Sequence, residues 1–364
     1  GKPSWYDDLL ESAIVGMVNA RDWKGLDALR TSTAAGIDPE LRARLGFIAA
    51  RTSLAGTDKA AVVLAEVADM RREAPYYALM ANVALGQVPA GENAVTSAID
   101  DASDDASDKS AYSFLRGYIE WFLPERLHQA AVDLKPALSP LMAAKLADEL
   151  SSMGRHGDAI RLVSLSLARA GAGAAGQTDG VDYAPFERIL YPRPWHAEVS
   201  GSARRFGLDE WVLYAMIRSE SLFQPGIVSG AGARGLTQLM DPTAADIARE
   251  LSRSSFDLAD PATNIEFGAY YLSRMIARLD GRILPACYAY NAGITRVRRW
   301  FDALDGLPAD IALEGLPYAE TREYGRKIIV AAATYGRLYY DKGPGTVVGG
   351  IFGTTEVPLA SANP

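Results

Sequence analysis

The chain has 364 residues, which is long for a single hydrophobic core, so we expect two domains. Its hydrophobic fraction of 49% and its charged fraction of 23% are ordinary for a soluble globular protein. No stretch approaches the roughly eighteen uninterrupted apolar residues that a membrane helix requires. The segment Gly1 to Ser4 contains no apolar part of a signal peptide, so we expect that any export signal was removed or never existed.

The net charge of −8 is unevenly distributed along the chain. Residues 1–185 hold 18 Lys and Arg against 25 Asp and Glu, whereas residues 186–345 hold 19 of each. Neither half has the basic surface that binding to nucleic acid requires. The composition therefore excludes nucleic acid as an expected partner.

Cysteine and histidine are scarce. Cys287 is the only cysteine, which excludes an intramolecular disulfide, and a small buried thiol is its favoured interpretation. The histidines, His128, His156 and His196, are too far apart in sequence to form a local metal motif, although spacing alone does not address distant ligands. We expect no metal and no cofactor.

Residues 5–170 have the pattern of short amphipathic helices separated by brief polar breaks. Asp38 and Pro39 are a typical helix cap and first residue, and Ser139 with Pro140 starts a later helix that Gly154 ends. The helix after Pro39 carries apolar residues at helical spacing: Leu41, Leu45, Ile48 and Ala49. No strict repeat period is present. Residues 1–170 are therefore predicted to form an irregular helical superhelix, for which a scaffold role is favoured over partner binding on a concave face.

The middle of the chain predicts a domain boundary. Residues 170–176 are only Gly and Ala, which is typical of a linker or an exposed loop, and Tyr191 to Pro194 form a stiff, extended entry into the second half of the chain. We expect a linker over residues 171–190 and a second domain over residues 191–345. Residues 346–364 form a tail that the pattern leaves unassigned.

Glu220 is the leading candidate for a catalytic acid. A helix is predicted to begin near Asp209, to fill a wide apolar stripe from Val212 to Ile217, and to end before Pro225. Glu220 then lies in the last turns of a buried helix, where the negative end of the helix dipole and apolar surroundings disfavour its ionised form. A carboxyl group held protonated suits a general acid. A glutamate on a helix is, taken alone, more often a solvated surface residue.

Four segments in this half of the chain carry its chemistry. A Gly-rich stretch at 228–235 allows the backbone to pass close to a ligand, and Gln238 offers the donors and acceptors that a sugar amide requires. The four segments stand in this order: Glu220-Ser221-Leu222-Phe223, Gly235-Leu236-Thr237-Gln238-Leu239-Met240, Ala289-Tyr290-Asn291-Ala292-Gly293 and Leu316-Pro317-Tyr318-Ala319-Glu320-Thr321-Arg322.

In order and spacing, these segments resemble the catalytic domain of the soluble lytic transglycosylases. Residues 1–170 resemble the α-superhelical domain of that family only in their succession of short amphipathic helices. Two positions depart from the family pattern: Thr237, where Met is usual, and Asp241, where Pro is common. The resemblance implies a mostly α protein, with the N-terminal superhelix followed by a lysozyme-like α domain that includes a small β element.

The resemblance also implies a reaction. Such an enzyme cleaves the β-1,4 bond after N-acetylmuramic acid in peptidoglycan without water and leaves a 1,6-anhydro end. The catalytic acid of the family corresponds to Glu220. Its substrate-binding residues correspond to Ser229, Gln238, Met240, Tyr290 and Glu320. Structural alternatives stay open for most of them: a turn for Ser229, core packing for Met240 and Tyr290, and an intramolecular contact for Glu320.

Two other functions compete with this interpretation. One is a goose-type lysozyme-like hydrolase, which transfers the sugar to water, and the other is an inactive scaffold that binds peptidoglycan. The implied partners are glycan strands and, through the helical region, other cell-wall proteins. The implied location is the periplasm or cell envelope. Because all four motifs lie within residues 186–345, we expect that segment to fold without the N-terminal half.

Overall fold

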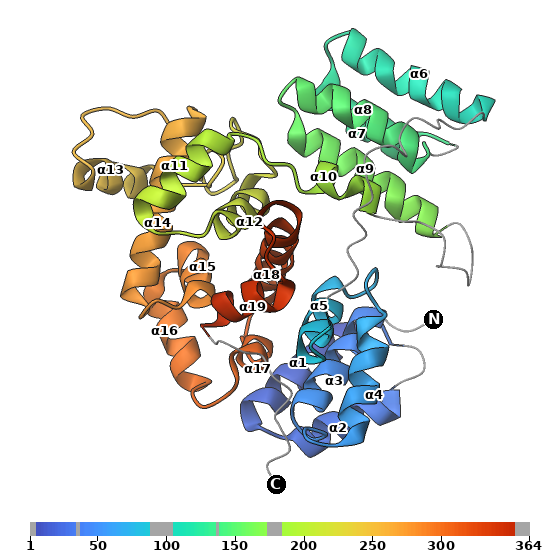
Figure 1. Cartoon of the computed structure of the whole chain (residues 1–364), viewed down its shortest axis with the longest axis vertical. Coiled ribbons are helices and arrows are strands. Elements are labelled where there is room, and N and C mark those ends of the chain that lie inside the picture. The colour runs from blue at the N-terminus through green and yellow to red at the C-terminus, as the bar shows by residue number, and fades with distance from the viewer. Residues whose placement is uncertain (1–4, 34–36, 88–104, 136–137, 173–183, 354–364) are drawn as a thin grey trace. The chain divides into compact units, whose positions relative to one another are not determined.

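The computed structural model describes residues 5–33, 37–87, 105–135, 138–172 and 184–353 (Figure 1). Within these ranges the chain forms nineteen α-helices, and no strand is present. Two isolated antiparallel bridges, Val228–Arg234 and Arg234–Leu239, are the only β pairing there. The prediction of a mostly α protein is confirmed, whereas the expected small β element amounts to those two bridges. None of the helices in the described ranges is long and apolar enough to cross a membrane.

The chain separates into two compact units that do not follow the order of the sequence. Unit 1 comprises Gly1–Pro89, Ala203–Met216 and Ala269–Pro364, and unit 2 comprises Ala90–Ser202 and Ile217–Gly268. The division falls within three helices: α11 (His196–Phe206), α12 (Glu210–Ser221) and α14 (Pro261–Arg278). The predicted domain boundaries at residues 170 and 191 stay a prediction.

The N-terminal part of unit 1 is a run of five helices, each packed against the next. They are α1 (Trp5–Ala20), α2 (Trp23–Thr33), α3 (Pro39–Arg51), α4 (Asp58–Ala68) and α5 (Pro75–Ala84). As predicted, α3 starts at Pro39, and the Asp38 side chain accepts hydrogen bonds from the backbone N–H groups of Glu40 and Leu41. The apolar set expected on this helix is buried.

The C-terminal part of unit 1 packs on these helices. Its own helices are α15 (Ile283–Ala292), α16 (Ile294–Ala303), α17 (Ala309–Glu314), α18 (Ala319–Tyr340) and α19 (Pro344–Phe352). Helices α5 and α19 both contact α18, and α1 contacts α17. The sequence pattern left residues 346–364 unassigned, yet α19 covers the first of them and buries Val347, Val348 and Ile351. Residues 354–364 lie outside the described part of the chain.

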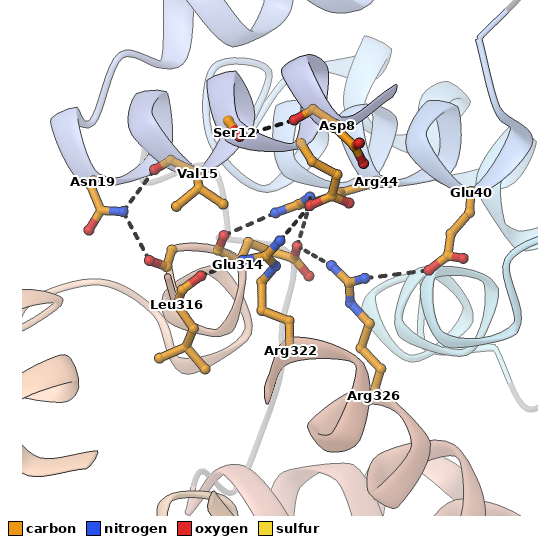
Figure 2. Close-up of polar contacts among 12 residues, drawn as sticks. Asp8, Ser12, Val15, Asn19, Glu40, Arg44, Glu314, Leu316, Arg322 and Arg326 are labelled. Atoms are coloured by element: carbon orange, nitrogen blue, oxygen red, sulfur yellow. Dashed lines mark hydrogen bonds and ion pairs between the residues drawn. The ribbon is translucent and has the colours of Figure 1, made fainter. Parts of the chain in front are cut away.

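A buried ion network joins the two parts of unit 1 (Figure 2). Glu314, at the end of α17, has no exposed surface. Its Oε2 accepts hydrogen bonds from Arg44 Nε at 2.6 Å, from Arg326 Nη2 at 2.7 Å and from the Tyr77 hydroxyl at 3.0 Å. Glu11 on α1 extends the network, since its carboxylate lies 2.7 Å from Arg44 Nη1.

The network keeps Glu314 ionised. Burial alone raises the pKa of this carboxyl group, but the charges of Arg326 and Arg44 and the hydrogen bonds that Arg326 and Tyr77 donate hold the pKa below its usual value. Arg44 and Tyr77 come from α3 and α5. A fragment of residues 186–345 would lack two of the groups that satisfy Glu314. The expectation that this fragment folds alone stays a prediction, and the missing groups argue against it.

Unit 2 holds the remaining helices. They are α6 (Ala106–Glu120), α7 (Pro124–Asp133), α8 (Pro140–Ser152), α9 (His156–Ala172), α10 (Glu187–Leu190) and α13 (Asp241–Glu250), with a short 3₁₀ turn at Ala184–Phe186. The predicted start of α8 is confirmed, because Ser139 Oγ accepts a hydrogen bond from the backbone N–H of Met142. Gly154, with φ +73°, separates α8 from α9, and these two helices pack closely together. Residues 173–183 of the predicted linker lie outside the described ranges.

Removing the charge of Glu314 should destabilise the protein more than removing that of an exposed glutamate. Glu314→Gln leaves two buried guanidinium groups with one neutral acceptor, and breaking a buried ion pair costs about 3–5 kcal/mol. Glu323→Gln on α18 is the matched control, since Glu323 forms an exposed pair with Lys327, and such pairs contribute about 0–1 kcal/mol. Urea unfolding followed by circular dichroism measures both. Equal losses in the two variants would contradict the role given to Glu314.

Candidate active site

The leading candidate residue lies where the sequence placed it. Helix α12 buries six consecutive residues, from Val212 to Ile217, and Glu220 is its next-to-last residue, with a half-buried side chain. The helix ends because Leu222 and Phe223 have φ values of +46° and +61°, before Pro225. The predicted end of this helix is therefore confirmed. Glu220 stands at the junction between a rigid buried helix and the loop after it.

That loop, residues 222–240, is closed on itself by hydrogen bonds. Ser229 Oγ accepts a hydrogen bond from the backbone N–H of Ala233 at 2.9 Å, and the Ser229 N–H donates to the Ala233 carbonyl at 2.9 Å. Ser229 thus has the structural turn role that the sequence left open. Its hydroxyl proton is not used in this contact and can still be donated to a ligand.

Gln238 and Met240 stand at the end of the loop. The Gln238 side chain donates a hydrogen bond from Nε2 to the carbonyl of Gly235 at 2.8 Å. Its amide nitrogen is therefore bonded within the loop, and its Oε1 is the atom that can bind a ligand. Met240 precedes α13 and is 41% exposed. Core packing, the structural alternative for Met240, does not fit this exposure.

Asn264 organises this loop, and nothing in the sequence pattern indicated that role. Asn264, on α14, is 1% exposed. Its Oδ1 accepts from the backbone N–H of Thr237 at 2.8 Å and from Thr237 Oγ1 at 2.7 Å, and its Nδ2 donates to the carbonyls of Arg234 at 3.1 Å and Leu258 at 3.0 Å. Gly235, with φ +79°, is required beside it, because a Cβ there would lie 2.1 Å from Asn264 Nδ2.

Position 237 shows why a departure from the family pattern is tolerated. Thr237 has no exposed surface, and both its backbone N–H and its hydroxyl group bond to Asn264. A buried hydroxyl requires such a partner. The sequence predicted that the helix carrying Asn264 starts at Asp260-Pro261. It gave no sign that Asn264 contacts the loop.

Tyr290 and Glu320 belong to unit 1, whereas Glu220, Ser229, Gln238 and Met240 belong to unit 2. Tyr290 is on α15, is half-buried, and packs edge-on against Tyr271 of α14 with ring centroids 5.0 Å apart. Glu320 is exposed in the first turn of α18. The structure thus gathers four of the six candidate residues in unit 2 and two in unit 1.

Glu320 borders a cavity of about 320 Å³ within unit 1. Its walls include Trp300 and Tyr318, whose ring centroids are 5.6 Å apart, together with the charged group of Arg296. Tyr288 also lines the cavity, and its buried hydroxyl has no hydrogen-bond partner in the structure. Apolar ring faces beside polar groups suit a ligand that presents both kinds of surface, as a sugar or a short peptide does.

Candidate metal ligands are scattered over the part of the chain that the structure describes. No group of three or more His, Cys, Asp or Glu side chains lies close enough together there to hold a metal ion. Cys287 is buried, as the sequence suggested.

Part of the chain matches a known family, and that part contains five of the six candidate residues, all except Glu320. Residues 199–310 match the family model of the transglycosylase SLT domain. The soluble lytic murein transglycosylase of Escherichia coli is 34% identical over 133 residues, which are 35% of this chain and 21% of that protein. The membrane-bound lytic murein transglycosylase C of Klebsiella pneumoniae is 31% identical over 164 residues, covering 38% of this chain and 45% of that protein.

Solved structures are similar over nearly the whole chain. The lytic transglycosylase Slt of Pseudomonas aeruginosa, solved as an inactive mutant, aligns with a TM-score of 0.70 at 24% identity, covering 93% of this chain and 53% of that one. The 70 kDa soluble lytic transglycosylase of Escherichia coli aligns with a TM-score of 0.71 at 20% identity, covering 94% and 53%. The chain spans about half the length of these structures. The predicted fold class, a helical superhelix with a lysozyme-like domain, is confirmed.

Replacing Asn264 should loosen the loop after Glu220. Asn264→Ala removes four hydrogen bonds and leaves buried backbone groups unsatisfied, which costs about 1–3 kcal/mol for each such group. Thr263→Ala is the neighbouring control, because the Thr263 hydroxyl bonds to Asp260 on its own turn. Hydrogen exchange at the amides of Thr237 and Leu239 should accelerate in the first variant alone. Unchanged exchange would show that Asn264 does not hold the loop.

Proposed function

We propose, from the match of residues 199–310 to the transglycosylase SLT domain family, that this chain cleaves the glycan strands of peptidoglycan as a lytic transglycosylase. The observation that carries the proposal is the position of Glu220 inside the matched segment. Glu220 is a half-buried acid at the end of a buried helix, directly before the hydrogen-bonded loop of residues 222–240. The proposed catalytic domain comprises residues 191–345. The family match and the relatives support an enzyme that acts on murein.

The reaction requires one acid and no water. Glu220 donates its proton to the glycosidic oxygen, and the bond from that oxygen to C1 of the muramic residue breaks. This step requires that Glu220 carries its proton before the reaction begins. The 2-acetamido oxygen of the same sugar stabilises the cationic C1. The Glu220 carboxylate then takes the proton of the 6-hydroxyl group, whose oxygen bonds to C1 and gives the 1,6-anhydro end.

The substrate replaces a second carboxylate. A retaining glycosidase that forms a covalent intermediate holds two carboxyl groups about 5–5.5 Å apart. The acetamido and 6-hydroxyl groups of the sugar make that second group unnecessary, because a well-oriented intramolecular nucleophile behaves as if present at about 10⁵ M or more. Proximity therefore favours attack by the 6-hydroxyl over attack by water.

The other candidates would bind and orient the glycan. The Ser229 hydroxyl proton and Gln238 Oε1 are the atoms that their loop contacts leave for sugar groups, and exposed Met240 would pack on a sugar face. Tyr290 would bind the glycan through its hydroxyl group. Glu320 would contact a bound sugar from the cavity that it borders.

Two alternative functions are less well supported. A goose-type lysozyme-like hydrolase would add one water to each product, and an inactive scaffold would bind glycan without releasing fragments. The presence of Glu220 argues against the inactive scaffold, and the match to the transglycosylase SLT domain and to lytic murein transglycosylases favours transglycosylation over hydrolysis.

The proposed substrate also sets the proposed location and partners. The cell envelope, and within it the periplasm, is the compartment where peptidoglycan occurs. Recruitment of other cell-wall proteins by the helical region is proposed on its superhelical fold alone, since helical arrays bind partners on extended concave surfaces.

Glu220→Gln should abolish cleavage while the protein stays folded. Loss of a general acid lowers a rate by roughly 10²–10⁴-fold, and the amide keeps the size of the side chain. The assay is mass spectrometry of muropeptides released from purified peptidoglycan, with circular dichroism to confirm the fold. Glu125→Gln, at an exposed position on α7, is the matched control and should keep full activity. Substantial release by Glu220→Gln would contradict the single-acid mechanism.

A further inference from the structure

Helix α9 contacts the turn after Glu220, although about 60 residues separate them. Gly157 and Arg161, one turn apart on α9, face Leu222 and Gln224 of the loop within unit 2. We propose that Gly157 and Arg161 are positioning residues for Glu220, so that the last helix before the predicted linker sets the geometry of the catalytic acid. This inference rests on the proposed role of Glu220.

The turn that receives this contact has an unfavourable backbone conformation. Leu222 and Phe223 are consecutive residues with positive φ, +46° and +61°. L-residues with a Cβ rarely adopt this region, because the Cβ crowds the following carbonyl. Such a conformation persists where the surroundings impose it. Phe223 is held by burial, at 1% exposed. Gln224 is held by Arg161 of α9, and the backbone of α9 closely approaches the Leu222 carbonyl at Gly157.

Arg161 holds Gln224 through two hydrogen bonds. The side-chain oxygen of Gln224 accepts from Nη1 and Nη2 of Arg161, both at 2.8 Å, in the amide orientation that the hydrogen-bonding pattern assigns. The guanidinium group is itself fixed, since Nη2 also donates to Asp158 Oδ1 at 2.7 Å. Asp158 is 10% exposed and pairs with Arg155 as well. Charge-assisted hydrogen bonds of this kind are shorter and stronger than neutral ones.

Gly157 allows the two segments to approach. A Cβ at this position would lie 2.7 Å from the carbonyl oxygen of Leu222 and 2.7 Å from the side-chain amide of Gln224. Real Cβ atoms do not come this close to backbone oxygen. Any larger residue at 157 must therefore force α9 and the turn apart, and Glu220 lies two residues before Leu222. Displacement of a reacting group by about 1 Å can cost 10²-fold in rate.

The helix offers a control for each variant. Arg169, also on α9, donates to the carbonyls of Ala131 at 2.8 Å and Val132 at 2.6 Å, which lie on α7 and not in the turn. Gly171, at the other end of α9, has open space where a Cβ would stand. Arg161→Ala is therefore compared with Arg169→Ala, and Gly157→Ala with Gly171→Ala. Arg161→Lys keeps the charge but cannot form both hydrogen bonds to Gln224.

Muropeptide release by the full chain, measured at a temperature where every variant is folded by circular dichroism, tests the inference. Arg161→Ala and Gly157→Ala should lower kcat at least tenfold with KM within twofold, and Arg161→Lys should lie between Arg161→Ala and the unmodified chain. The two controls should keep kcat within twofold even if their melting temperatures fall equally. A kcat that is unchanged in both test variants, or lowered as much in the controls, would overturn the positioning role.

A second measurement separates this inference from the proposed function. Hydrogen exchange at the amides of Leu222, Gln224 and Ile227 should accelerate at least tenfold in Arg161→Ala and not in Arg169→Ala. If the unmodified chain releases no muropeptides, the proposed function fails, and exchange alone decides whether α9 holds the turn. Equal exchange in the two arginine variants would show that it does not.

Discussion

The buried carboxylate of Glu314 is the interaction on which the rest of unit 1 depends. It has no contact with solvent, so its charge must be met by protein groups, and these come from α3, α5 and α18. Directional bonds to Arg44, Arg326 and Tyr77 allow one arrangement of these helices, whereas apolar contacts alone would allow several. Buried ion pairs add little net stability compared with apolar packing, and fixing one register is their best-supported use.

This constraint extends to a candidate binding residue. Glu314 lies five residues before the start of α18, whose first turn carries Glu320. Glu320 borders the cavity that Trp300 and Tyr318 line, and also a second cavity of about 520 Å³ whose lining includes Arg44 and Arg326 of the network. The N-terminal helices therefore help to fix the position of Glu320. In unit 2, helix α9 likewise contacts the turn after Glu220. The helical region is thus part of the structure around each group of proposed site residues.

Sequence reasoning was most reliable where the cause of a structural feature is local. Asp38 with Pro39 and Ser139 with Pro140 start helices where they were expected, and α12 ends before Pro225. Caps, proline and helical periodicity act over a few residues, so the sequence displays them directly. Glu220 was proposed as the acid partly from the local apolar stripe before it and chiefly from the order and spacing of four motifs, and its catalytic role stays a prediction.

The features that sequence reasoning missed all depend on distant partners. Glu314 stands in an apolar run, which is a weak signal of burial, but Arg44 is 270 residues away. Asn264 bonds to Thr237 across 27 residues, and Gly157 meets Leu222 across the predicted linker. Helix α19 was missed because its Gly- and Val-rich sequence has low helix propensity, and burial against α5 and α15, as well as α18, stabilises it instead. Tertiary packing decides each of these cases, and no local pattern reports it.

The central claim is that one acid, Glu220, is sufficient because the substrate provides its own nucleophile. Digestion of purified peptidoglycan in ¹⁸O-labelled water tests this claim most directly. We expect every new muramic end to be a 1,6-anhydro residue without label, since water takes no part in the bond that forms. Reducing muramic ends that carry ¹⁸O at C1 would mean that water is the nucleophile, and the lysozyme-like hydrolase would replace the mechanism proposed for this chain.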